Sequence, residues 1–130
     1  PLFQEYEVCA RGLVVLFPEP LNPRAEELLA RHHIETEGYE TVALSEEEFG
    51  EDTLVLAMQD SIKQKIQNDY PGKGQVYTLC EFVNGSKEIP SVYGQTQEQY
   101  EQMYVLIQGY VKKLANKLNE EAKNKCQMYT

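Results

Sequence analysis

The three cysteines, Cys9, Cys80 and Cys126, are the residues of this 130-residue chain best suited to nucleophilic or metal chemistry. No two of them form a CxxC pair, and the odd count does not suit the disulfide framework of a small secreted protein. Cys9 and Cys80 fall in segments with strand-like composition, where a free cysteine usually packs as a small hydrophobic residue. We therefore expect a reduced, cytoplasmic protein that holds no metal and no other cofactor.

The pair His32-His33 is the other candidate for a metal site. Adjacent residues on a helix point about 100° apart, and no third ligand lies nearby in the sequence. A helix C-terminus also favours cationic groups such as Arg31 and the histidines. The pair therefore indicates a solvated helix end rather than a metal site.

A proline turn at residues 89–94 is the strongest candidate for a binding site. Pro90 has a fixed φ, Gly94 permits a sharp bend, and Thr96 can cap a following helix with its hydroxyl. This combination predicts a rigid turn that faces solvent, with Tyr93 as an exposed ring able to contact a ligand or a protein partner.

Apolar residues recur at spacings of three and four after the turn, which predicts a long amphipathic helix with one buried stripe. The stripe consists of Tyr100, Tyr104, Ile107, Val111, Leu114 and Leu118. The helix is expected to end at about Leu118, and residues 119–130 to form a polar tail.

The rest of the chain alternates between strand-like and helix-like patterns. In chain order these are a strand at 6–16, a helix from Asn22-Pro23 to about His33, an extended stretch at 39–44, a helical turn at 45–48, a strand at 53–58, a helix capped by Asp60 or Ser61, and a strand at 75–80. The run at 53–58 is uninterruptedly apolar, which is typical of a strand buried on both faces of a parallel sheet. The order predicts one α/β domain over residues 1–130, a three-layer sandwich with a mostly parallel sheet.

The net charge of −9 is concentrated in the first half of the chain. Residues 1–59 carry thirteen acidic and three basic side chains, whereas residues 60–130 carry eight and nine. Such a surface repels phosphate backbones, so nucleic acid is not an expected partner. No apolar run approaches the ~20 residues needed to cross a bilayer, so a membrane is not expected either.

The turn at 89–94, followed by Tyr100-Glu101 and a long helix, resembles the acid loop and last helix of the low-molecular-weight protein tyrosine phosphatases. Residues 11–20 and the helix start at Asn22-Pro23 are similar to that family's second strand and second helix. The stretch EDTLVLAMQDSIKQKI is similar to its central strand and the helix that follows. The resemblance implies the phosphotyrosine protein phosphatase I-like fold and, for active members, hydrolysis of phosphomonoesters.

The residues that perform this family's chemistry have no counterpart in the chain. The family uses a Cys-x5-Arg phosphate loop, but the residue six positions after Cys9 is Val15, the one six positions after Cys80 is Ser86, and Cys126 lies too near the end. The family's general acid is the Asp of an Asp-Pro turn, and Ser91 stands at that position. We therefore assign no catalytic residue.

Three carboxylates, Asp60, Asp69 and Glu88, could replace the missing acid only if geometry allowed, and Glu88 is the nearest to the turn in sequence. Two interpretations remain open. The chain is a catalytically inactive phosphatase-like domain, truncated at the N-terminus, that acts as a binding or remnant module. Alternatively, it is the C-terminal part of an active protein tyrosine phosphatase whose phosphate loop lies upstream of Pro1.

A missing first strand also has a consequence for assembly. In the family that strand lies in the middle of the sheet, so its absence would leave the segments 6–16 and 53–58 with unpaired edges, and such edges invite another chain. The two segments must pair with each other or be completed by a second copy. Because direct pairing requires a close-packed core to rearrange, we expect a homodimer.

Overall fold

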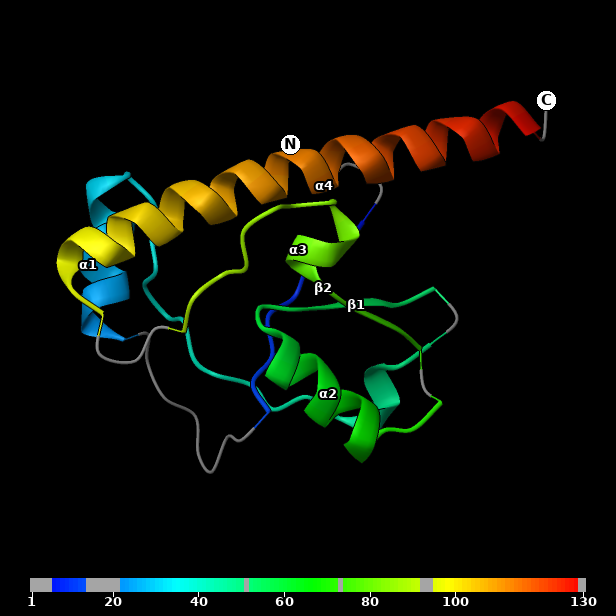
Figure 1. The fold of residues 1–130 in the computed structure, drawn as a ribbon, viewed down its shortest axis with the longest axis horizontal. Helices are drawn as coiled ribbons and strands as arrows, with labels where there is room; N and C mark the ends of the chain where they lie inside the picture. The colour runs from blue at the N-terminus through cyan, green and yellow to red at the C-terminus, as the bar shows by residue number, and fades with distance from the viewer. Residues whose placement is uncertain (1–5, 14–21, 51, 73, 92–94, 129–130) are drawn as a thin grey trace.

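The computed structural model describes residues 6–13, 22–50, 52–72, 74–91 and 95–128, with side chains described as far as Glu120 (Figure 1). The elements in chain order are α1 (Pro23–Arg31), the 3-10 turn η1 (Glu46–Glu48), β1 (Leu54–Ala57), α2 (Asp60–Asp69), β2 (Gln75–Thr78), α3 (Leu79–Phe82) and α4 (Gln97–Met128). The expected α/β order is confirmed.

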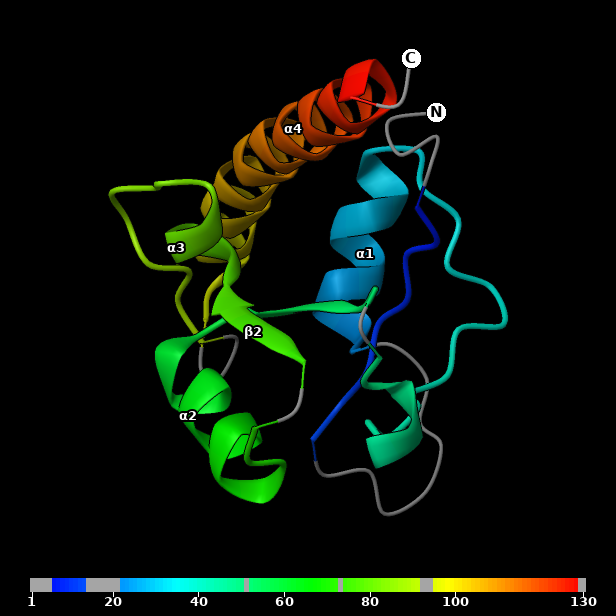
Figure 2. The same ribbon diagram turned by 90° about the vertical axis from the view of Figure 1, so that its right-hand side faces the viewer.

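The sheet consists, among the described residues, of the two parallel strands β1 and β2, with Leu54 opposite Gln75 and Ala57 opposite Thr78. Parallel neighbours require a crossover connection, which α2 supplies. Figures 1 and 2 show α2 on one face of this pair and α3 on the other. The predicted strand at 53–58, the helix after it and the parallel pairing are therefore confirmed, although the sheet is smaller than expected. The predicted cap of that helix is wrong, because its N-cap is Gln59, without a side-chain cap hydrogen bond, and Asp60 and Ser61 already lie in the helix.

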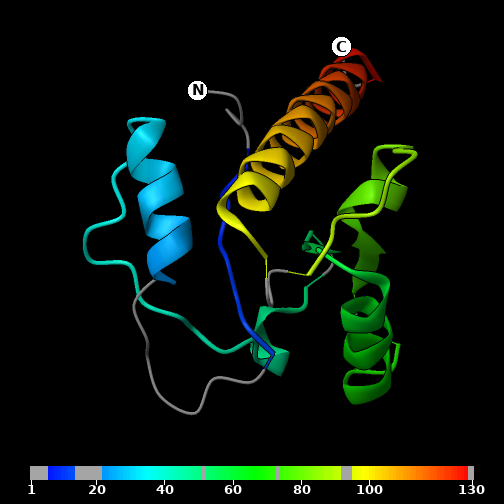
Figure 3. The same cartoon turned by 60° about the vertical axis from the view of Figure 1, so that its left-hand side comes forward.

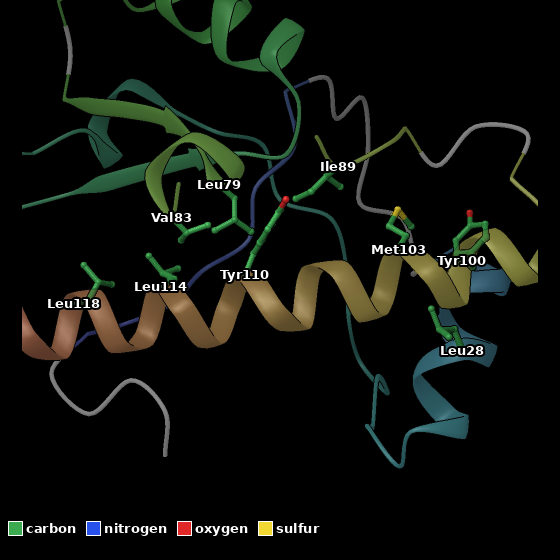
Figure 4. Close-up of a cluster of buried hydrophobic side chains, with 9 residues drawn as sticks. All are labelled: Leu28, Leu79, Val83, Ile89, Tyr100, Met103, Tyr110, Leu114 and Leu118. Carbon is green, nitrogen blue, oxygen red and sulfur yellow. The ribbon is translucent and has the colours of Figure 1, made fainter. Parts of the chain in front are cut away.

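The main hydrophobic core lies between α4 and the elements packed against it (Figure 4). Its buried members are Leu28, Leu79, Val83, Ile89, Tyr100, Met103, Tyr110, Leu114 and Leu118. Five of these nine side chains come from α4, as the predicted stripe required. Met103 and Tyr110 are buried, whereas Tyr104, Ile107 and Val111 of the predicted stripe are only half-buried.

The long helix α4 extends past its predicted end. Thr96 caps it as expected, because its hydroxyl accepts the Gln99 N–H at 3.2 Å while the Gln99 side chain accepts the Thr96 N–H at 2.7 Å. The helix continues to Met128 rather than ending at about Leu118, so the expected polar tail is largely helical. The end of the buried stripe is not a stop signal, since residues 119–128 contain several good helix formers and neither Gly nor Pro. No helix in the described parts of the chain is long and apolar enough to cross a membrane.

The predicted helix start at Asn22-Pro23 is confirmed. The Asn22 side chain accepts the Arg24 N–H at 2.9 Å, and Pro23 occupies the first turn, where its missing N–H costs nothing. Leu28 is the buried residue of α1 and belongs to the core formed with α4. The helical turn expected at 45–48 is η1, in which the Ser45 N–H donates to the Glu48 carboxylate at 3.0 Å.

The predicted strand at 6–16 is wrong over its described part. Residues 6–13 form a single isolated bridge, between Gly12 and Ala43, while residues 14–16 lie outside the described residues. Side chains hold this segment instead: Arg11 Nε lies 2.5 Å from Glu48 Oε1, and the Tyr6 hydroxyl donates to the Leu118 carbonyl at 3.3 Å. Figure 3 shows the segment, in blue, running apart from the β1–β2 pair. Composition favoured a strand, but no described neighbour supplies a continuous ladder.

The strand expected at 75–80 ends two residues early, because α3 begins at Leu79. Thr78 and Glu81 form a reciprocal cap, in which the Thr78 hydroxyl accepts the Glu81 N–H and the Glu81 carboxylate accepts the Thr78 N–H, both at 3.0 Å. Lys63 Nζ of α2 lies 2.8 Å from the same carboxylate. The hydrogen bonds from Lys63 and from the Thr78 backbone lower the pKa of Glu81.

A hydrogen-bonded clamp built on Tyr110 fixes the chain between α3 and the proline turn. The Tyr110 hydroxyl accepts the Lys87 N–H at 3.1 Å and donates to the Lys87 carbonyl, and Cys80 Sγ lies 3.7 Å from it. Burial raises the pKa of the Tyr110 phenol. A Cβ on Gly85 would lie 2.6 Å from the phenol oxygen, so this position has room only for glycine. The clamp therefore places residues 85–88 against α4.

We expect Tyr110→Phe to destabilise the fold by about 1–3 kcal/mol, because the Lys87 N–H and C=O would lose their shared partner inside the fold. Chemical denaturation followed by circular dichroism measures the change. Tyr104→Phe is the matched control on the same helix, since the ring face of Tyr104 stacks on His32. Equal effects of the two substitutions would show that the hydroxyl of Tyr110 contributes nothing specific.

Candidate functional site

The proline turn is anchored to the first turn of α2. Gln59 Nε2 donates to the Ile89 carbonyl at 3.4 Å and to the Pro90 carbonyl at 3.2 Å, and the Glu88 carboxylate accepts the Asp60 N–H at 3.2 Å. The Ile89 side chain is only 2% exposed and packs in the core (Figure 4). Core packing of Ile89 and hydrogen bonds to the start of α2 thus fix residues 88–91, the start of the turn.

The three carboxylates that could replace the missing acid lie at different points along α2. Glu88 lies at the N-terminus of α2, where an anion interacts favourably with the helix dipole and with free N–H groups. Asp60 accepts a hydrogen bond from Gln64 at 2.6 Å within α2. Asp69 is at the other end of α2, about 13 Å away along the helix axis. The geometry brings Glu88 and Asp60 to the turn but leaves Asp69 distant from it.

Ser91 is exposed at the surface end of the turn. Tyr93, the predicted ligand-binding residue, lies with Val92 and Gly94 outside the described residues, so its position stays a prediction. Tyr100 is 2% exposed in the core, which confirms its place in the buried stripe.

His32 bridges two helices. It caps the C-terminal end of α1, its ring stacks on Tyr104 of α4 with centroids 3.9 Å apart, and its Nε2 lies 3.2 Å from Glu101. His33 is exposed and has a positive φ of 60°. No cluster of metal-binding side chains occurs among the residues that the structure describes. His32 is thus a packing residue between α1 and α4, a role that the sequence did not predict.

Cys9 and Cys80 do not lie in strands, although strands were predicted at both positions. Cys9 is exposed in the irregular segment 6–13, and Cys80 is in α3, where its Sγ lies 3.4 Å from the Gly85 carbonyl and 3.3 Å from the Lys87 carbonyl. Cys80 is half-buried beside the clamp, and the side chain of Cys126 is not described. The Thr78-x-x-Glu81 pattern is a capping box and could have predicted α3, and with it the position of Cys80.

An ion pair between Arg11 and Glu48 lies away from the turn. Arg11 Nε and Glu48 join the segment 6–13 to η1, and hydrogen bonds from the Ser45 backbone and from Arg11 lower the pKa of Glu48. Hydrogen bonding to Glu48 raises the pKa of Arg11 in turn. Both side chains are about one-third exposed, so the contact orients the segment more than it stabilises the fold.

Comparison with known proteins finds the same architecture in solved phosphatases. A low molecular weight protein tyrosine phosphatase from T. tengcongensis is 28% identical with a TM-score of 0.74, and the match covers 82% of this chain and 74% of the relative. YwlE arginine phosphatase from Geobacillus stearothermophilus is 25% identical with a TM-score of 0.82, covering 94% and 80%. A YwlE mutant from Bacillus subtilis is 31% identical with a TM-score of 0.66, covering 75% and 67%. None of the curated proteins compared with the chain matches it.

The family model for low molecular weight phosphotyrosine protein phosphatase matches residues 3–124, nearly the whole chain. The strand β1, the helix α2 and the turn before α4 are the described elements on which the resemblance in sequence was based. The chain therefore belongs to the low molecular weight phosphotyrosine protein phosphatase family.

Proposed function

We propose that this chain is a catalytically inactive domain of its family, a pseudoenzyme that binds a ligand or a protein partner in the cytoplasm. The observation that carries the proposal is the absence of a Cys-x5-Arg pattern from all 130 residues. Without it the chain has no thiolate positioned to attack phosphorus and no Arg positioned to hold the phosphoryl oxygens. Ser91 adds to this, because a serine hydroxyl cannot protonate a leaving group as a carboxylic acid does.

The surface proposed for recognition is the turn at 89–94, with Tyr93 as the contact ring. Support comes from its anchoring, since Ile89 is buried and Gln59 bonds two successive carbonyls of the turn. Its described part, residues 89–91, is already fixed, and a fixed segment loses little conformational entropy when it binds. The solved relatives are described as tyrosine and arginine phosphatases, so a phosphotyrosine-type ligand and a phosphoarginine are the probes to compare.

A second candidate function is that of the C-terminal part of an active phosphatase. The lengths of the solved relatives favour it, because the matches cover 74% and 80% of their chains. An in-frame Cys-x5-Arg sequence upstream of the codon for Pro1 would select this candidate over the first.

The chain is expected not to hydrolyse an aryl phosphate such as p-nitrophenyl phosphate. A steady-state assay against a buffer blank, with the same chain carrying Cys80→Ser as the control, measures this. Turnover above the blank that disappears in Cys80→Ser or in Cys9→Ser would overturn the proposal of an inactive domain.

Phosphotyrosine is expected to perturb the backbone amide resonances of Ile89 and residues 91–94 more than inorganic phosphate or phosphoarginine does, because only phosphotyrosine offers a ring to Tyr93. Chemical-shift mapping with the three ligands at millimolar concentration tests this. The amides of residues 64–69, at the far end of α2, serve as the internal control. Unchanged shifts throughout 89–94 would remove the turn as a recognition surface.

If an upstream phosphate loop is found, Ser91→Asp in the complete enzyme should raise kcat by about 10²–10⁴ for phenyl phosphate, since general-acid help is typically worth that much. The gain should be smaller for p-nitrophenyl phosphate, whose leaving group needs less protonation. Glu88→Gln is the matched control, and it should leave kcat unchanged because Glu88 lies at the start of α2. A fall in kcat with Glu88→Gln, together with no gain from Ser91→Asp, would show that Glu88 is the acid.

A further inference from the structure

The side chain of Gln59 contacts two successive carbonyl groups of the proline turn. Its Nε2 donates to the Ile89 carbonyl at 3.4 Å and to the Pro90 carbonyl at 3.2 Å. Both partners can only accept hydrogen bonds, so the nitrogen of the side-chain amide faces them, not the oxygen. One uncharged NH₂ group therefore supplies a donor to each of two neighbouring peptide units.

The convergence of these two carbonyls determines how the backbone runs. In an extended chain, successive carbonyls point to opposite sides and cannot reach the same nitrogen atom. The backbone therefore bends between Ile89 and Pro90. The ring of Pro90 fixes its φ, so the dihedral angle that remains to be set before Ser91 is the ψ of Pro90. That angle directs the Pro90 carbonyl, which is the group that Gln59 holds.

Packing fixes the chain before this angle but not the angle itself. The Ile89 side chain is buried in the core cluster drawn in Figure 4, whereas Pro90 and Ser91 are both exposed. Gln59 also occupies the N-cap position of α2, yet its side chain makes no cap hydrogen bond to that helix. A side chain at an N-cap normally bonds its own helix. The Gln59 amide is directed to the turn instead.

We propose that Gln59 is the positioning residue of the turn, whose amide sets the ψ of Pro90 and with it the direction in which Ser91 and the following residues meet a ligand. The inference rests on the proposed function, which makes this turn the recognition surface. It assigns to the junction of β1 and α2 a role in binding, although Gln59 itself need not touch the ligand. An uncharged donor is required there, because a carboxylate would repel both carbonyl oxygens.

The first test is spectroscopic and uses Gln59→Glu, which replaces the donor by a carboxylate of almost the same shape. The carbonyl ¹³C resonances of Ile89 and Pro90 report hydrogen bonds to their oxygens, and we expect both to move upfield at neutral pH. The N–H of Ser91 belongs to the same peptide unit as the Pro90 carbonyl, so its order parameter should fall. Gln67→Glu is the matched control, since Gln67 is exposed on the same helix.

A pH series separates positioning from a general structural effect of the substitution. The neighbouring carbonyl oxygens disfavour the anion, so they raise the pKa of the introduced carboxyl above its ordinary value. Once protonated, this carboxyl has one O–H donor, and one of the two displaced ¹³C resonances should return as the pH falls. Glu88 and Asp60 lie near the same junction and titrate in both variants, so subtraction of the Gln67→Glu series removes their contribution.

The second test measures the Kd for phosphotyrosine by titration at neutral pH. We expect Gln59→Glu to raise Kd by about 2–10-fold, because fewer chains then hold the turn in its binding orientation, whereas Gln67→Glu should leave Kd unchanged. If Gln59→Glu fails to fold, Gln59→Leu removes the donor without adding charge. It should move the same two ¹³C resonances upfield at every pH.

Unchanged ¹³C resonances of Ile89 and Pro90 in the Gln59 variants would overturn the proposal, and so would an unchanged Kd despite displaced resonances. A chain that binds no phosphotyrosine, but whose resonances respond to Gln59→Glu and recover at low pH, gives a different result. That outcome would support the positioning role of Gln59 and overturn the recognition function of the turn.

Discussion

Burial of one face of α4 is the constraint on which the described structure depends. The β1–β2 pair has four residues in each strand and is too small to form a core by itself. The apolar face of α4 supplies the missing surface, because it packs Leu28 of α1 near one end and Leu79 and Val83 of α3 further along. Elements that are far apart in the sequence are therefore joined through this helix rather than through the sheet.

The hydrogen bonds of Tyr110 tie the chain that leads into the proline turn to α4. Tyr110 holds Lys87 through both of its backbone groups, and Ile89 enters the core two residues later. Gln59 and Asp60 then hold the same stretch from α2. Residues 88–91, the described part of this stretch, are thus fixed from two sides although they form no regular secondary structure. The order of this stretch therefore comes from contacts within the chain itself.

The segment 6–13 is the least integrated part of the described fold. It is held by one bridge, by the Arg11–Glu48 ion pair and by the Tyr6 hydroxyl, all at its margins. Each of these contacts is exposed or half-exposed and contributes little compared with core packing. Among the described residues of the acidic first half, Leu28 is the buried member of the main cluster, and Ala25, Leu54 and Leu56 pack against it.

The sequence by itself determined the elements that depend on local signals. Asn22-Pro23 begins α1, Thr96 caps α4, and the apolar run around β1 forms a strand, because caps and hydrophobic periodicity act within a few residues. Family membership was also evident from short motifs in order, of which the turn after Ile89 was the most informative.

Tertiary structure decided what depends on distant partners. Residues 6–13 have strand-like composition but no described ladder to join, so only Gly12 forms a bridge. Cys80 and Tyr110 meet although thirty residues separate them, and His32 stacks on Tyr104 across two helices. A paired strand, a hydrogen-bonded clamp and a stacked ring pair each need two partners that are distant in the sequence. Which residue becomes the partner is decided only when the chain packs.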